Sequence, residues 1–232
     1  MNSKKWKRMI PLAIRNLYRR IEFDYNYKLI NRRTVSKIMI IGCGRSGTTY
    51  TSKLFNSLGY KVGHERLERN GISSWLLVSN QQKVFIGPSF EELKSLNLPV
   101  VHQVRHPLKA ISSFQATGHQ SWQFLAYEIP INYEEDSKVL KGMKYWYYWN
   151  LMAEEKSSFT YQVENLDDVF PELLKAGQFT AVVDKRNEVA KTTNTRSHIG
   201  LSWRDLRRED PVLTDKIIVL AKKYGYQDNL KD

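Results

Sequence analysis

The chain has 232 residues, of which 41% are hydrophobic, with 36 Lys and Arg side chains, 24 Asp and Glu side chains and one cysteine. This length and apolar content predict one folded domain, or one domain with an appendage, and exclude wholesale disorder. Because Cys43 is the only cysteine, the chain has no intrachain disulfide and no multi-cysteine zinc site, which fits a reducing compartment. We find no uncharged apolar run of about 18 residues and no signal-peptide pattern, so we expect a cytoplasmic protein, soluble or peripheral to a membrane.

The positive charge is concentrated at the N-terminus. Residues 1–37 carry 11 basic and 2 acidic side chains, a net charge of +9, whereas the other 195 residues carry 25 basic and 22 acidic ones, a net charge of +3. We therefore divide the chain into a basic N-terminal segment, residues 1–36, and a domain that comprises residues 37–232. The segment contains no recognisable nucleic-acid-binding module, so we expect no nucleic acid partner.

Apolar residues recur in this segment at the spacing of one helix face: Trp6, Ile10, Ile14, Leu17 and Ile21. One interpretation is that the helix docks this stripe on the domain and leaves its charges in water. The other is that a basic amphipathic helix lies on an anionic membrane. We favour docking, because an apolar stripe is the usual mark of a surface helix.

Strands and helices alternate along the rest of the chain. We predict strands at residues 38–41, 60–62, 99–104 and 159–163, helices at 48–58, 107–114, 137–155 and 212–224, and a short helix that starts at Pro171. The wholly apolar run at 38–41 is typical of a strand buried on both faces of a parallel sheet. The alternation predicts an α/β domain, a three-layer sandwich with a central parallel sheet. The aromatic run at 145–149 lies inside a predicted helix, and we interpret it as core rather than as a platform for an acceptor.

The segment from Gly42 to Thr49 reads Gly-Cys-Gly-Arg-Ser-Gly-Thr-Thr and fits the pattern of a phosphate-binding loop. The glycines allow backbone N–H groups to face an anion, and the following helix adds its positive end. Thr48 replaces the lysine that normally grips the β and γ phosphates of a nucleoside triphosphate, while Arg45 supplies a cation elsewhere in the loop. We therefore predict a P-loop-like site for an anionic ester.

This sequence resembles the sulfotransferases that use 3′-phosphoadenylyl sulfate (PAPS). Residues 44–49 match the family's loop for the 5′-phosphosulfate, and a second match 60 residues after Arg45 pairs Arg105 at a strand end with Ser113. The resemblance implies that PAPS is the co-substrate and that 3′-phosphoadenosine 5′-phosphate (PAP) is the product. It implies a donor site made of Arg45, Ser46, Gly47, Thr48, Thr49, Tyr50, Arg105, Ser113 and Arg196. Glu164 resembles the acidic residue that follows a central strand in many members.

The resemblance also implies the catalytic residues. Arg45 is placed to stabilise charge on the leaving phosphate, and Glu65 matches the glutamate that some members use as the base. His64 is the alternative base, because imidazole titrates near neutral pH. Adjacent residues of an extended chain point to opposite sides, so we expect only one of the two to face the donor.

We thus expect transfer of a sulfuryl group to an acceptor hydroxyl of a carbohydrate, a peptide or a small molecule. No metal is expected, because the histidines match no ligand pattern. Two alternatives stay open. One is a nucleotide-dependent kinase or NTPase, which the missing loop lysine disfavours. The other is a non-catalytic nucleotide-binding adaptor at a membrane surface.

Overall fold

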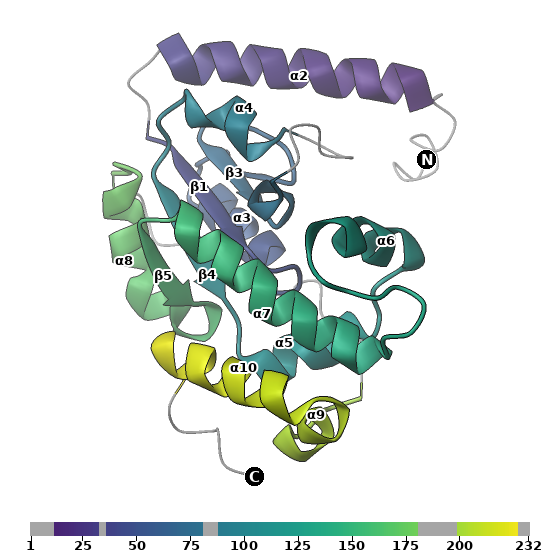
Figure 1. The fold of residues 1–232 in the computed structure, drawn as a ribbon. Helices are drawn as coiled ribbons and strands as arrows, with labels where there is room; N and C mark the ends of the chain where they lie inside the picture. The colour runs from purple at the N-terminus through teal and green to yellow at the C-terminus, as the bar shows by residue number, and fades with distance from the viewer. Residues whose placement is uncertain (1–11, 33–35, 81–87, 181–198, 227–232) are drawn as a thin grey trace, which may run out of the picture.

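A computed structural model describes residues 12–32, 36–80, 88–180 and 199–226. Its centre is a five-stranded sheet in the order β2-β3-β1-β4-β5, in which all neighbouring strands are parallel (Figure 1). The strands are β1 Ile38–Gly42, β2 Gly63–His64, β3 Gly71–Ser74, β4 Val100–Val104 and β5 Phe159–Gln162. The predicted α/β class with a central parallel sheet is confirmed.

Helices cover both faces of the sheet. They are α2 Leu12–Arg32, α3 Thr48–Ser57, α4 Phe90–Lys94, α5 Pro107–Phe114, α6 His119–Glu128, α7 Lys138–Lys156, α8 Leu166–Ala176, α9 Trp203–Glu209 and α10 Pro211–Lys223, with short 3₁₀ turns at Leu76–Val78 and Val163–Asn165. Alternate residues of β1 point into two separate cores: Ile38 and Ile40 pack with α3 and α8, whereas Met39 and Ile41 pack with α5, α7 and α10. This two-sided burial explains why the strand is apolar throughout.

Most predicted elements match the structure, and the misses have physical causes. Residues 60–62, where we expected a strand, have no regular structure, and the paired residues are Gly63 and His64. Pro171 does not start a helix but lies inside α8, which begins at Leu166. We did not predict β3, because the strand Gly-Ile-Ser-Ser has only one large apolar residue and so lacks a strand pattern. The aromatic run in α7 does belong to the core, with Tyr145, Trp146 and Trp149 buried.

The N-terminal helix docks through a different face from the one we favoured. Ile14, Leu17 and Ile21 are exposed by 44%, 60% and 56%, so the predicted docking of this stripe is wrong. Ile30 is buried instead, and the Asn26 amide donates to the carbonyl of Leu67 at 3.1 Å. Trp6 and Ile10 lie outside the described residues. Among the helices of the described ranges, none has both the length and the apolar character needed to cross a bilayer.

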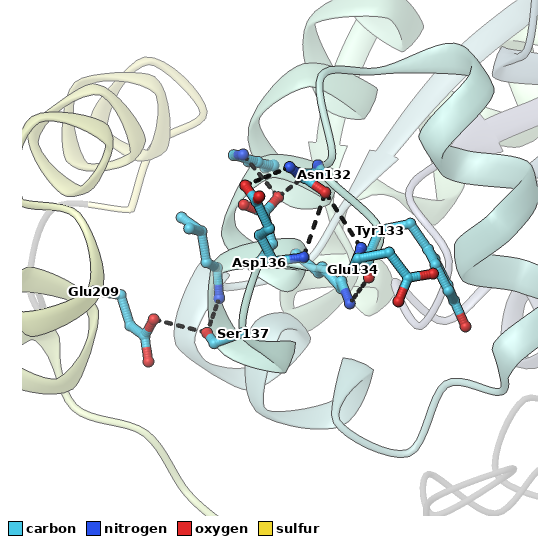
Figure 2. A network of polar contacts seen from close by, with 10 residues as sticks. Asn132, Tyr133, Glu134, Asp136, Ser137 and Glu209 are labelled. Carbon is cyan, nitrogen blue, oxygen red and sulfur yellow. Dashed lines mark hydrogen bonds and ion pairs between the residues drawn. The ribbon is translucent and has the colours of Figure 1, made fainter.

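The turn between α6 and α7 is held by its own polar groups (Figure 2). The Asn132 backbone N–H donates to Asp136 at 2.9 Å, and its side-chain oxygen accepts the backbone N–H of Glu134 at 3.2 Å. Ser137 caps α7 and donates its hydroxyl proton to Glu209 of α9 at 2.7 Å. This network joins α9 to the start of α7.

His102, in the middle of β4, is fully buried and neutral. Asn150 donates its own N–H to the carbonyl of Trp146, so its Oδ1 faces His102 Nε2, which must donate at 3.1 Å. His102 Nδ1 then accepts from the hydroxyl of Thr160 at 3.0 Å. Burial lowers the pKa of His102 from 6.5 to about 4, a shift that the bond to Asn150 partly offsets. The expectation that His102 is a satisfied strand residue is confirmed.

This burial predicts a specific loss of stability in acid. Between pH 6.5 and about 4 the unfolded state binds more protons at His102 than the folded state does. The free energy of unfolding should therefore decrease as the pH is lowered through this window, and His102 should account for roughly 3 kcal/mol of the decrease at most. When the free energy of unfolding is measured by urea denaturation across this pH range, His102→Gln should make it depend less on pH. His119→Gln, at an exposed position, should leave the pH dependence unchanged. Equal pH dependence in all three proteins would contradict the burial of a neutral imidazole.

Candidate active site

The loop between β1 and α3 forms the floor of the candidate site. Gly47 ends it in the left-handed region at φ 96°, and α3 then begins without a side-chain cap. A Cβ on Gly47 would lie 2.8 Å from Val163 and 3.1 Å from the Gln103 amide nitrogen, so no larger residue fits. An uncapped helix start after such a turn is a favourable position for a phosphate or sulfate group.

Gln103, the fourth residue of β4, fixes this loop from beneath. Its amide nitrogen donates to the carbonyl of Ser46 at 2.5 Å. Its amide oxygen accepts two hydroxyl protons, from Thr51 of α3 at 2.5 Å and from Tyr161 of β5 at 2.6 Å. Because the side chain is fully buried, each of these bonds replaces one with water. The backbone of the loop is therefore held in one conformation by the neighbouring strands.

The two basic motifs meet above the loop. An Arg105 guanidinium nitrogen donates to the backbone carbonyl of Arg45 at 3.0 Å, and Arg45 Nε donates to the hydroxyl of Ser113 at 2.9 Å. Arg45 adopts φ 63°, a left-handed conformation that costs a non-glycine residue about 1 kcal/mol. The bonds to Arg105 and Ser113 stabilise that conformation and direct the Arg45 side chain toward α5.

His64 and Glu65 lie on the opposite side of the loop, and both face the cavity. The Glu65 backbone is left-handed at φ 57°, so the alternation of an extended chain, from which we expected only one of the two to face the donor, does not apply here. His64 Nε2 lies 3.1 Å from the hydroxyl of Thr49 and 3.3 Å from that of Thr48. Glu65 accepts the indole N–H of Trp75 at 3.0 Å, and its carboxylate lies 3.8 Å from His64.

His64 carries no charge at neutral pH. Burial lowers its pKa below the ordinary 6.5, and the charge of Glu65 opposes that shift without overcoming it. A neutral imidazole can accept a proton and can share hydrogen bonds with the two threonine hydroxyls. The pair of residues therefore presents one carboxylate and one neutral base to the same cavity.

Glu164 stands at the cavity wall but uses both oxygens to hold the fold. One accepts the backbone N–H of His106 at 3.0 Å, and the other accepts the hydroxyl of Tyr226 at 2.8 Å. Glu164 thus ties the start of α5 to the chain that follows α10. Burial, with the nearby Glu164 carboxylate, raises the pKa of Tyr226, so its hydroxyl stays a donor.

Tyr145 closes the far side of the loop. Its hydroxyl accepts the backbone N–H of Gly44 at 2.9 Å, and its ring packs against Phe114 at 4.7 Å between centroids. A Cβ on Gly44 would lie 2.7 Å from that hydroxyl, which explains the small residue there. Cys43, beside it, is fully buried and its pKa is raised, as expected for a residue that packs rather than reacts.

These side chains surround one cavity of about 680 Å³. The site residues predicted from sequence that line it are Arg45, Gly47, Thr48, Thr49, Tyr50, His64, Glu65 and Arg105. Ser46 and Ser113 do not, because both are buried and their hydroxyls bond to Cys43 and Arg45. Arg196 lies outside the described residues.

Sequence reasoning missed four residues of the site: Gln103, Tyr145, Trp75 and Lys109. A glutamine inside an apolar strand was a usable signal, because a buried amide must find partners. Lys109 lies in the first turn of α5 and adds a third cation to the cavity. Tyr145 belongs to the aromatic run that we interpreted as core, and it is both buried and part of the cavity wall, whereas no sequence pattern placed Trp75 there. Within the described ranges no group of three or more His, Cys, Asp or Glu side chains is arranged to hold a metal ion.

Comparisons with known proteins add a likeness of fold. No family model matches the sequence, and no curated protein matches it. Among solved structures, the chain is similar to the mouse sulfotransferase SULT7A1, crystallised in complex with PAP. The two share 10% identity with a TM-score of 0.44, over 90% of this chain and 91% of that one. At this distance the likeness concerns the course of the chain, and the chemistry must be argued from the residues above.

The position of Gln103 predicts a large cost for its loss. Gln103→Leu leaves the Thr51 and Tyr161 hydroxyls and the Ser46 carbonyl without their partner, so the free energy of unfolding should fall by about 3 kcal/mol. Tyr161→Phe removes one of these bonds and should cost about 1 kcal/mol. Urea denaturation measures both values. If the two variants lose equal stability, Gln103 does not organise the loop.

Proposed function

We propose that this protein transfers a sulfuryl group from 3′-phosphoadenylyl sulfate to an acceptor hydroxyl. One observation carries the proposal: two basic motifs 60 residues apart line one cavity, where Arg105 donates to the backbone of Arg45 at 3.0 Å. The donor has two anionic ends, a 5′-phosphosulfate and a 3′-phosphate. A phosphate-binding loop beside a separate arginine offers one site for each.

The residues of the cavity fit such a donor in charge and in hydrogen-bonding groups. α3 starts after Gly47 without a side-chain cap, and Thr48 and Thr49 line the same cavity. We assign the phosphosulfate to Gly47, Thr48 and Thr49, the 3′-phosphate to Arg105, and the adenine to the ring of Tyr50. Ser46 and Ser113 do not contact the donor in this assignment. The Ser46 hydroxyl bonds the loop backbone at Cys43, and the Ser113 hydroxyl accepts from the Arg45 side chain.

The reaction exchanges one S–O bond for another: the acceptor oxygen bonds to sulfur, the bridging oxygen leaves with the bisphosphate, and the acceptor proton goes to a base. Arg45, which cannot readily act as an acid, would stabilise the charge on the leaving phosphate. We assign the proton to Glu65, because its carboxylate is held toward the cavity by Trp75. His64 is the alternative, and its bonds to the loop threonines also suit a positioning role.

Binding of simple nucleotides tests the role of Arg105. We expect Arg105→Ala to weaken adenosine 3′,5′-bisphosphate by about 10- to 100-fold, because a charge-assisted phosphate contact is lost. Binding of adenosine 5′-monophosphate, which lacks the 3′-phosphate, should change much less. Titration calorimetry measures both, with Arg207→Ala, an exposed arginine on α9 that pairs with Asp215, as the control. Equal weakening of both nucleotides would mean that Arg105 only supports the loop.

Substitution of the two candidate bases separates their roles. With ³⁵S-labelled donor and a panel of simple phenols and sugars, Glu65→Gln should lower kcat by about 10²- to 10⁴-fold, because the amide cannot take the proton. The amide oxygen can still accept from Trp75, so the Kd for adenosine 3′,5′-bisphosphate should stay unchanged. If His64→Gln shows the larger loss of kcat, the base is His64.

A further inference from the structure

The outward face of α2 exposes a group of large apolar side chains. Of the nine large hydrophobic side chains exposed in the described ranges, five lie on this helix: Ile14, Leu17, Tyr18, Ile21 and Tyr25. Their spacing of three, one, three and four residues places them on one side of a helix. We call these five residues the outer face of α2. Their exposed fractions run from 44% to 67%.

The domain does not need the outer face for its own packing. α2 is attached through the opposite side, where Ile30 is buried and Phe23 and Tyr27 pack on the core. Polar bonds fix the same side: Tyr27 meets Ser95 at 2.6 Å, and Arg20 pairs with Glu92 of α4 at 3.2 Å. In Figure 1, α2 lies across one end of the molecule beside α4, with α9 and α10 at the other end. The outer face is therefore presented outward on a fixed helix.

The positive charge of the N-terminal segment favours an anionic partner for the outer face of α2. Lys28 is exposed on the same side of α2 as the outer face, and residues 1–37 together carry a net charge of +9. A second copy of the chain would bring two such segments together and repel itself. An anionic lipid surface attracts the positive charge and also accepts the apolar side chains. Tyrosine is enriched at the interface between lipid and water.

We propose that the outer face of α2 binds the surface of anionic membranes, with the helix lying in the plane of the interface. The apolar residues enter the boundary between headgroups and acyl chains, while the basic residues contact the headgroups. The inference does not depend on the reaction proposed above. In this arrangement α2, at one end of the domain, makes the contact with the membrane, and the loop after β1 takes no part in that contact.

Flotation with lipid vesicles tests this proposal on the full chain. The wild type should bind vesicles of phosphatidylcholine with phosphatidylserine, and should bind pure phosphatidylcholine weakly at about 0.15 M salt. The double variant Leu17→Ser, Ile21→Ser should lower the partition coefficient at least about tenfold, because two apolar side chains are removed from the interface. The matched control is Val212→Ser, Val219→Ser, which removes two equally exposed side chains from α10 and should bind like the wild type.

Thermal denaturation of each variant first establishes that the fold is intact. Equal binding of the wild type and the α2 variant, or no preference for anionic vesicles, overturns the proposal. Light scattering tests the alternative that a second copy of the chain covers the outer face of α2. A wild-type dimer that becomes a monomer in Leu17→Ser, Ile21→Ser, without binding to vesicles, would assign the outer face to a second copy of the chain.

Discussion

The buried amide of Gln103 is the interaction on which the candidate site depends. One side chain near the carboxyl end of β4 bonds the loop after β1, the first turns of α3 and the neighbouring strand β5. A buried amide is costly unless its hydrogen bonds are made, so each of these three segments constrains the others. The loop is thus shaped before any ligand arrives, and binding an anion need not include the cost of ordering it.

The arginines extend this rigid loop into a site with two cationic positions. Arg105 leaves β4 two residues after Gln103, and its guanidinium bonds the backbone of Arg45, so one strand end fixes both the floor and the wall of the cavity. The left-handed backbone at Arg45 and at Glu65 turns each side chain toward a position that an extended chain would not give it. Strained residues of this kind cluster at functional sites, where the surrounding bonds stabilise them. The site therefore depends on the backbone conformation of Arg45 and Glu65 and on the hydrogen bonds around them, and not on an unusual residue type.

Local pattern was enough to predict the framework, and long-range contacts explain the rest. The apolar run of β1, the glycines of the loop and the proline at the start of α5 each act within a few residues, so the sequence predicted these elements well. The eight predicted site residues that line the cavity came from a resemblance to a known family as well as from local pattern. The partners of Gln103 and the contact of Tyr145 with Gly44 join residues 52 to 101 positions apart, which no periodicity reveals. The N-terminal stripe misled us because periodicity identifies an apolar face but not what covers it.

The central claim is that one cavity holds the two ends of an adenosine 3′,5′-bisphosphate. A crystal structure of the protein with that compound, grown without magnesium, is the most direct measurement. We predict the 5′-phosphate at Gly47, Thr48 and Thr49, and the 3′-phosphate within hydrogen-bond distance of the Arg105 guanidinium. A nucleotide bound elsewhere, a 3′-phosphate pointing into solvent, or binding that requires magnesium and a second 5′-phosphate would contradict it.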